Sequence, residues 1–71
     1  DVNQALRALQ TELDGLESEM RDVLLLLAMD ELSYESAALL LSIPVGTVRS
    51  RVSRARATLR RRLEASGHSV A

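Results

Sequence analysis

The chain of 71 residues has no cysteine, no lysine, no tryptophan and no phenylalanine, and it contains a single histidine, His68. Without cysteine it has neither a disulfide framework nor a cysteine-based zinc site. One histidine in a polar tail provides too few ligands for another kind of metal site. It also leaves no nucleophile, base and orienting group from which an active site could be assembled. The sequence therefore predicts a protein that is not an enzyme and that needs no cofactor.

Long apolar runs are missing as well. The longest one, residues 23–29, is far shorter than the roughly 20 residues that span a bilayer, and no signal peptide pattern is present. We therefore expect a cytoplasmic protein without membrane insertion, and the lack of cysteine is consistent with a reducing compartment. Because the chain begins with Asp1 rather than methionine, we expect a fragment of a longer protein in which residues 1–71 form a single small domain.

Charge is distributed unevenly along the chain, although its net value is only −1. Residues 1–43 contain nine acids and two arginines, a net charge of −7, whereas residues 44–71 contain seven arginines and one acid, a net charge of +6. This asymmetry indicates that the C-terminal half faces a polyanion. Every basic residue is arginine, whose planar guanidinium can donate two parallel hydrogen bonds to a phosphate or to a guanine.

Glycine and proline are scarce, and no segment alternates like a half-buried strand, so the chain is predicted to be all-α. Apolar periodicity and capping residues place helices at residues 2–13, 17–30, 34–41 and 44–65. Ser33 is suited to cap the third helix, and Pro44 to occupy the first position of the fourth. A short helix, a tight turn and a long basic helix form a helix-turn-helix, which is expected at residues 33–63. The predicted fold is a small four-helix domain with a C-terminal helix-turn-helix, followed by a frayed tail at residues 66–71.

The expected fourth helix has two different faces. On a helical wheel one stripe is apolar and is predicted to be buried: Val48, Val52, Ala55, Leu59 and Leu63. The opposite face carries small residues between arginines: Gly46, Ser50, Ser53, Arg54, Ala57 and Arg61, with Thr47 and Arg49 at its edges. Small residues let the backbone approach a groove, and arginines can then reach phosphates or base edges. The alternative is a solvated basic face, but the absence of any acid on this helix before Glu64 favours contact with nucleic acid.

The remaining arginines of this helix fit other roles. Arg51 and Arg56 flank the buried stripe, so each could pair with an acid such as Glu35 and brace the domain. For Arg51, bracing or contact with a phosphate is favoured over recognition of a base. Residues 60–62 lie where a straight helix leaves a groove, and we expect them to add general electrostatic attraction or solubility.

Three segments of the chain together carry a family resemblance. They are R-D-V-L-L-L at residues 21–26, L-S-Y-E-S-A-A at residues 32–38 and I-P-V-G-T-V-R-S-R-V-S-R-A-R at residues 43–56. In this order they resemble region 4 of bacterial sigma factors of the sigma-70 family, most closely the extracytoplasmic-function (ECF) group. The resemblance extends over about residues 16–63, and the last segment is its most specific part.

The resemblance implies that the domain binds the minus-35 element of a promoter, as part of an ECF sigma factor that directs transcription initiation. It also implies docking on the beta-subunit flap of the RNA polymerase core through an apolar groove, and control by an anti-sigma factor. The positions that match residues approaching promoter DNA are Pro44, Gly46, Thr47, Arg49, Ser50 and Arg54. Ser33 and Tyr34 match the start of the first motif helix, where backbone N–H groups meet a phosphate. Arg51 and Ser53 complete the expected DNA-binding set.

The sequence departs from the family pattern at four positions. Glu17 stands where proline is usual, so the second helix is expected to begin less sharply. Leu39 replaces a residue that is often charged; it is either an exposed apolar contact for polymerase or an inhibitor, or it packs against the first helix. Ser42 stands where glycine or asparagine is usual, and it is strained if its backbone is left-handed. Ser53 replaces a bulky residue, which weakens the DNA contact expected there.

Two other interpretations remain open. The domain could be a similar helix-turn-helix in another regulator, such as a response regulator, which a phosphoacceptor domain elsewhere in the full-length chain would indicate. It could also be a decoy that binds an anti-sigma factor without contacting DNA. The intact set of Arg49, Ser50 and Arg54 argues against the decoy, because a decoy needs none of them.

Overall fold

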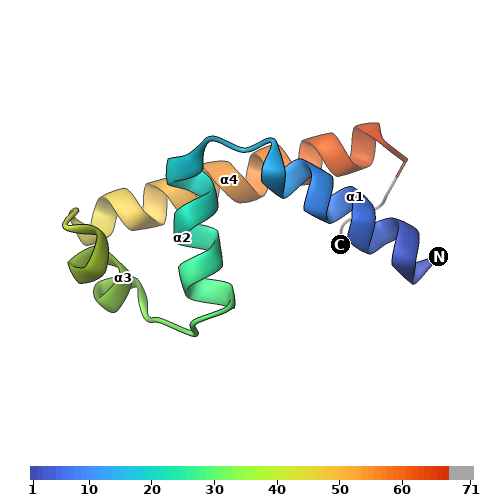
Figure 1. Ribbon diagram of the computed structural model, residues 1–71. Coiled ribbons are helices and arrows are strands. Elements are labelled where there is room, and N and C mark those ends of the chain that lie inside the picture. The colour runs from blue at the N-terminus through green and yellow to red at the C-terminus, as the bar shows by residue number, and fades with distance from the viewer. Residues whose placement is uncertain (68–71) are drawn as a thin grey trace.

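Four helices make up the computed structural model, which describes residues 1–67 (Figure 1). They are α1 (Val2–Asp14), α2 (Ser18–Ala28), α3 (Tyr34–Leu41) and α4 (Val45–Ala65). This arrangement confirms the predicted all-α, four-helix fold. Of the tail predicted at residues 66–71, residues 68–71 and with them His68 lie outside the described residues. No helix among residues 1–67 is both long enough and apolar enough to cross a membrane.

Four predicted helix ends are displaced by one or two residues, and the first of them is the end of α1, at Asp14 instead of residue 13. α2 begins at Ser18 after Glu17, whose side chain makes no capping hydrogen bond to the helix. It ends at Ala28 instead of continuing to residue 30. Pro44 has an extended backbone (φ −63°, ψ 148°) and stands just before α4 rather than in its first position. Proline tolerates both positions, since neither requires its missing N–H.

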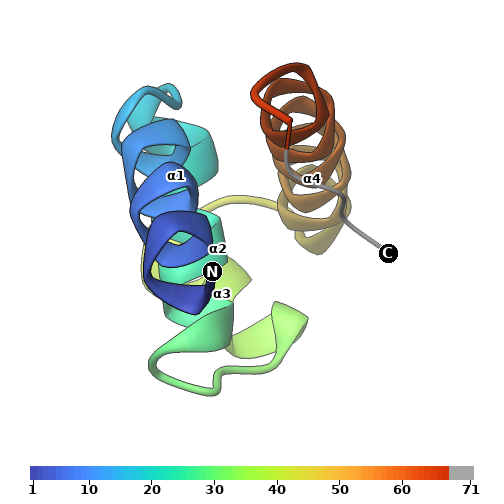
Figure 2. The same cartoon turned by 90° about the vertical axis from the view of Figure 1, so that its right-hand side faces the viewer.

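Helix α4 is the element against which the other three pack. Helices α2 and α3 lie against its N-terminal half, and α1 runs beside its C-terminal half (Figure 1, Figure 2). The core sits where α2, α3 and α4 meet. It is formed by small and β-branched side chains: Val23, Ala37, Ala38, Val48 and Val52. Because Ala37 is fully buried and short, α3 can approach α4 closely.

The apolar stripe predicted on α4 is buried with one exception. Val48, Val52, Ala55 and Leu63 are buried, whereas Leu59 is only half-buried. Leu59 lines an open cleft together with Leu9 of α1. The predicted stripe does face the other helices. However, α1 covers the C-terminal part of α4 less completely than α2 and α3 cover its N-terminal part.

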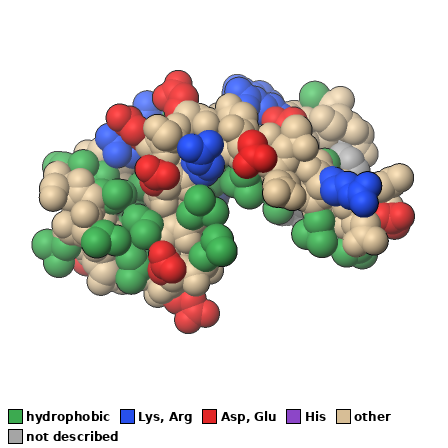
Figure 3. Space-filling view, viewed as in Figure 1, with side chains coloured by type: hydrophobic (Ala, Val, Ile, Leu, Met, Phe, Trp, Pro, Cys, Tyr) green, Lys and Arg blue, Asp and Glu red, His purple; other side chains and the backbone are tan. Residues whose placement is uncertain are grey.

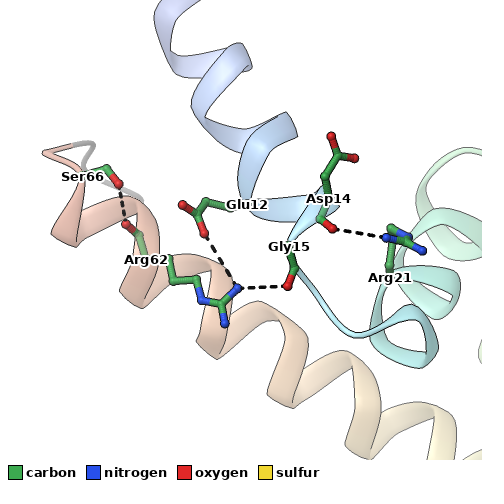
Figure 4. A network of polar contacts seen from close by, with 6 residues as sticks. All are labelled: Glu12, Asp14, Gly15, Arg21, Arg62 and Ser66. Atoms are coloured by element: carbon green, nitrogen blue, oxygen red, sulfur yellow. Dashed lines mark hydrogen bonds and ion pairs between the residues drawn. The ribbon is translucent and has the colours of Figure 1, made fainter.

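Polar contacts hold the end of α1 in place (Figure 4). The Arg62 guanidinium of α4 donates to the backbone oxygen of Gly15 at 3.4 Å and lies 3.9 Å from the Glu12 carboxylate. On the other side, Arg21 of α2 donates to the backbone oxygen of Asp14 at 3.4 Å. Arg62 thus joins α4 to the end of α1, a contact that was not predicted, while the electrostatic or solubility role expected for residues 60–62 stays a prediction.

The turn between α3 and α4 fixes how these two helices meet. Ser33 caps α3 as predicted, since its hydroxyl accepts a hydrogen bond from the Ser36 N–H at 3.0 Å. At the other end of α3, Ser42 has a left-handed backbone (φ 57°, ψ 44°). Its N–H and that of Ile43 donate to carbonyl groups in the last turn of α3, including that of Ala38. The left-handed conformation considered for Ser42 is confirmed.

We expect Ser42→Gly to stabilise the domain by about 0.5–1 kcal/mol, because glycine adopts the left-handed conformation without the Cβ penalty that serine carries. Urea unfolding followed by circular dichroism measures the change. Ser50→Gly is the matched control, since Ser50 is an exposed residue inside α4, where glycine destabilises. A lower unfolding midpoint for Ser42→Gly than for the unchanged chain would contradict the expectation.

Candidate nucleic-acid interface

The first half of α4 turns a face of small residues and arginines to solvent, opposite the buried Val48 and Val52. The exposed positions are Pro44, Gly46, Arg49, Ser50, Ser53 and Arg54, and Thr47 beside them is half-buried. A Cβ placed on Gly46 would meet nothing within 4 Å, so nothing inside the domain requires glycine there. This surface has the composition predicted from the helical wheel: short side chains between long cations.

Arg49 is the most constrained arginine of this face. Its guanidinium lies 3.6 Å from the carboxylate of Glu35, and its central carbon lies 5.0 Å from the ring centroid of Tyr34. Both partners belong to the first turn of α3. The structure thus joins two residues that the sequence placed in the site, Tyr34 and Arg49, and adds Glu35 as a third.

Arg51 occupies a different position. It forms an ion pair of 3.4 Å with Glu19 at the start of α2, and its side chain is only 22% exposed. A bracing role with an acid was one of the two roles favoured for Arg51, although the acid is Glu19 and not Glu35. DNA contact by Arg51 stays a prediction, and it would have to be made by a side chain already engaged with α2.

The start of α3 offers backbone donors next to Arg49. Helix N-termini carry N–H groups without an intrahelical acceptor. The Ser33 hydroxyl accepts from the N–H of Ser36, and the Ala37 N–H reaches the Ser33 carbonyl. The N–H groups of Tyr34 and Glu35 come before these two N–H groups in the first turn of α3, and they are available to a phosphate oxygen. Ser33 is exposed and Tyr34 half-buried, so the predicted phosphate contact lies on an accessible surface.

An apolar groove lies between α2 and α3. Hydrophobic side chains gather over these two helices (Figure 3). The groove is lined by Leu25, Leu26, Met29, Leu40 and Leu41, with Asp22 and Asp30 among its lining residues. Two of the apolar residues, Met29 and Leu40, are 75% and 65% exposed. So much exposed apolar surface in one place is typical of a protein-binding site.

Leu39 does not line this groove; it lines an open pocket at the turn between α3 and α4, together with Ile43 and Val45. Its side chain is 83% exposed. Packing of Leu39 against α1 is therefore excluded, and its exposure is confirmed, while a contact of Leu39 with polymerase or an inhibitor stays a prediction. Among residues 1–67 no cluster of three or more acids or histidines could hold a metal ion.

The comparison with known protein families bears on both surfaces. The sequence profile of the family described as Sigma-70, region 4 matches residues 6–59. This chain belongs to that family. The matched segment includes most of α1, all of α2 and α3, and α4 as far as Leu59, so it covers the core, the groove and the exposed face in the first half of α4.

Individual relatives of this sigma region 4 domain are RNA polymerase sigma factors. An ECF RNA polymerase sigma factor EcfG from Rhodopseudomonas palustris is 45% identical over 47 residues, which are 66% of this chain and 26% of that protein. ECF RNA polymerase sigma-E factors from Salmonella typhimurium and Escherichia coli are each 46% identical over 44 residues, or 62% of this chain and 23% of theirs. The chain thus matches about a quarter of the length of these curated relatives. The resemblance recognised in the sequence is confirmed.

Proposed function

We propose that this domain binds promoter DNA as region 4 of an ECF RNA polymerase sigma factor, and that α4 recognises the minus-35 element. The observation that carries the proposal is the exposed face of α4, where Gly46, Ser50 and Ser53 alternate with Arg49 and Arg54. Short residues let the backbone of a helix sink into the major groove, while arginines reach the edges of guanines. Because the chain is similar to sigma factors, we propose that the DNA it binds is a promoter.

Further contacts support the same orientation on DNA. In the complex that we propose, the DNA backbone on the two sides of the major groove meets Ser33 and Tyr34 at the start of α3, and Pro44 and Thr47 at the start of α4. Backbone contacts fix the register of the protein, whereas contacts to base edges provide the specificity. In this arrangement Arg51 approaches a phosphate from the flank of α4.

The test is a selection from a library of random-sequence DNA duplexes, followed by binding measurements on the selected duplex and on a scrambled duplex of the same composition. We expect the selected duplex to bind more tightly at every salt concentration, with affinity for both falling as salt rises. Equal binding to both duplexes would contradict base recognition. Absence of binding to either one would support the decoy that engages only an anti-sigma factor.

The groove between α2 and α3 fits a second partner, the beta-subunit flap of the RNA polymerase core. Its apolar lining suits an amphipathic helix, whose anchors insert into a groove of this kind. A single helix-turn-helix buries limited surface on DNA, so attachment to polymerase raises the effective concentration of the domain at the promoter. We therefore propose that the groove binds the flap and that α4 binds DNA.

Leu40→Asp is expected to weaken binding to the isolated flap at least about tenfold, because a carboxylate then enters an apolar contact. Titration of a labelled flap fragment measures the effect. Binding of the selected DNA duplex should change much less. Leu6→Asp is the matched control, since Leu6 is 57% exposed on α1, away from the groove. Equal losses of flap binding in the two variants would contradict a docking site at the groove.

The remaining proposals concern the partner of Leu39, the class of regulator and the location of the protein in the cell. We propose that Leu39 contacts polymerase or an anti-sigma factor, since its side chain is 83% exposed and accessible to a partner. The family match over residues 6–59 extends beyond the helix-turn-helix, which favours a sigma factor over a response regulator. Sigma factors are initiation factors rather than enzymes, and they act on polymerase and DNA, so we place the protein in the cytoplasm.

A further inference from the structure

Two neighbouring residues of α3 hold one arginine of α4. The ring of Tyr34 lies under the Arg49 guanidinium at 5.0 Å from centroid to central carbon, and the Glu35 carboxylate reaches its Nη2 at 3.6 Å. A cation over an aromatic face and an ion pair to the same guanidinium restrict it in two directions. The three residues therefore connect the beginnings of the two helices of the helix-turn-helix.

The ion pair within this cluster contributes little to stability, whereas the Tyr34 ring also packs against the core. The side chains of Arg49 and Glu35 are 57% and 69% exposed, and ion pairs between exposed groups contribute little to the free energy of unfolding. The two charged residues also lie outside the buried core. An acid beside the DNA-binding face would, on charge alone, weaken the binding of DNA. Its presence calls for another explanation.

Geometry leaves Arg49 able to contact DNA while it is held. A guanidinium has five N–H donors, of which those on Nη2 face Glu35. The others remain for a phosphate or a base edge. Arg54 differs, since the ion pairs found among residues 1–67 involve Arg49, Arg51 and Arg62 but not Arg54. Of the two long side chains on the exposed face, one is thus oriented before DNA arrives and the other is not.

We propose that Glu35 determines specificity by positioning Arg49, with Tyr34 as the platform on which the guanidinium lies. This inference rests on the proposed DNA-binding function. Orientation before binding reduces the side-chain entropy lost when Arg49 meets its correct acceptor. The Glu35 carboxylate repels DNA phosphates at the same time, so complexes held only by backbone contacts are weakened. The first effect increases the preference for the correct duplex, and the second keeps general affinity for DNA low.

The first test is Glu35→Gln, which keeps the shape of the side chain and removes its charge. Affinity for the scrambled duplex should rise about threefold to tenfold at low salt, because one repulsive charge near the phosphates is gone. The ratio of affinities for the selected and scrambled duplexes should fall about threefold to tenfold, because Arg49 loses its fixed direction. Glu64→Gln is the matched control: it makes the same change in net charge on an exposed residue at the far end of α4. The ratio should stay unchanged in this variant.

A double-mutant cycle identifies the residue through which Glu35 acts. In an Arg49→Ala background, Glu35→Gln should leave the ratio of affinities unchanged, since no guanidinium is left to position. Tyr34→Leu should lower the ratio without raising affinity for the scrambled duplex, because it removes the platform and alters no charge. An unchanged ratio in Glu35→Gln, or an equal fall in the Arg49→Ala background, would overturn the inference. These results are distinct from failure of the proposed function, in which the unchanged chain itself shows no preference between the duplexes.

Discussion

Val48→Asp is expected to unfold the domain. Val48 is fully buried at the junction of α2, α3 and α4, where Val23, Ala37 and Val52 surround it. An aspartate there has no cation to pair with, and an uncompensated buried charge destabilises a protein by at least about 3–5 kcal/mol. A small domain of 71 residues has a free energy of unfolding of only about 4–10 kcal/mol. The substitution therefore removes most or all of its stability.

Circular dichroism at the helical bands, with and without urea, measures this loss. Ser53→Asp is the matched control, because it introduces the same side chain on the exposed face of the same helix. We expect that variant to keep its helical content and its unfolding midpoint to within a small shift. A cooperative transition for Val48→Asp close to that of the unchanged chain would mean that α4 packs through another face.

The fold could be predicted from the sequence where short-range physics decides it. Ser33 caps α3 through its own hydroxyl, and Ser42 ends it in the conformation that glycine or asparagine usually adopts. The direction of the buried stripe on α4 follows from helical periodicity alone, so Val48 and Val52 were identified correctly. These features depend on residues only a few positions apart in the chain.

Features that depend on how helices meet could not be predicted. Leu59 belongs to the apolar stripe, yet it is half-buried because α1 leaves an open cleft beside it. The partner of Arg62 is the end of α1, 47 positions away along the chain, and no periodicity relates the two. Long-range contacts of this kind are fixed by crossing angles and loop lengths, which a single sequence does not state.

The same distinction applies to the candidate site. Exposure of Gly46, Ser50 and Arg54 was predicted from the wheel and is observed. The pairing of Arg49 with Glu35 was not predicted, although Glu35 had been considered as a partner for other arginines. One signal was available: Glu35 and Tyr34 follow directly after the Ser33 cap, at the end of α3 that a helix-turn-helix brings next to the start of α4.

Helix α3 takes part in both proposed surfaces. Its first turn holds Arg49 on the face proposed to bind DNA, and its last turn contributes Leu40 and Leu41 to the apolar groove. The buried Ala37 and Ala38 between them pack α3 into the core. The contacts that we propose with polymerase and with DNA would thus be made by the two ends of one short helix. Substitutions at one end should leave the other function largely intact.

Arg54→Ala is expected to lower affinity for the selected duplex by about 1–3 kcal/mol, or roughly fivefold to 150-fold. Arg54 is exposed on the face of α4 that we propose enters the groove, and no acid among residues 1–67 pairs with it. Its guanidinium is therefore free to donate two parallel hydrogen bonds to a guanine edge. Affinity for the scrambled duplex should fall much less, because only one phosphate-attracting charge is lost there.

Two matched variants distinguish recognition of a base from non-specific electrostatic attraction to the phosphates. Arg61→Ala removes the same side chain from the same face two turns farther along α4, and it should weaken binding to both duplexes to a similar, small extent. Arg54→Lys keeps the charge but loses the planar pair of donors, so the preference should fall while affinity for the scrambled duplex is kept. Equal losses on both duplexes in Arg54→Ala would assign Arg54 to a phosphate. Recognition of the promoter by this domain would then have to reside in Arg49 and the residues that hold it.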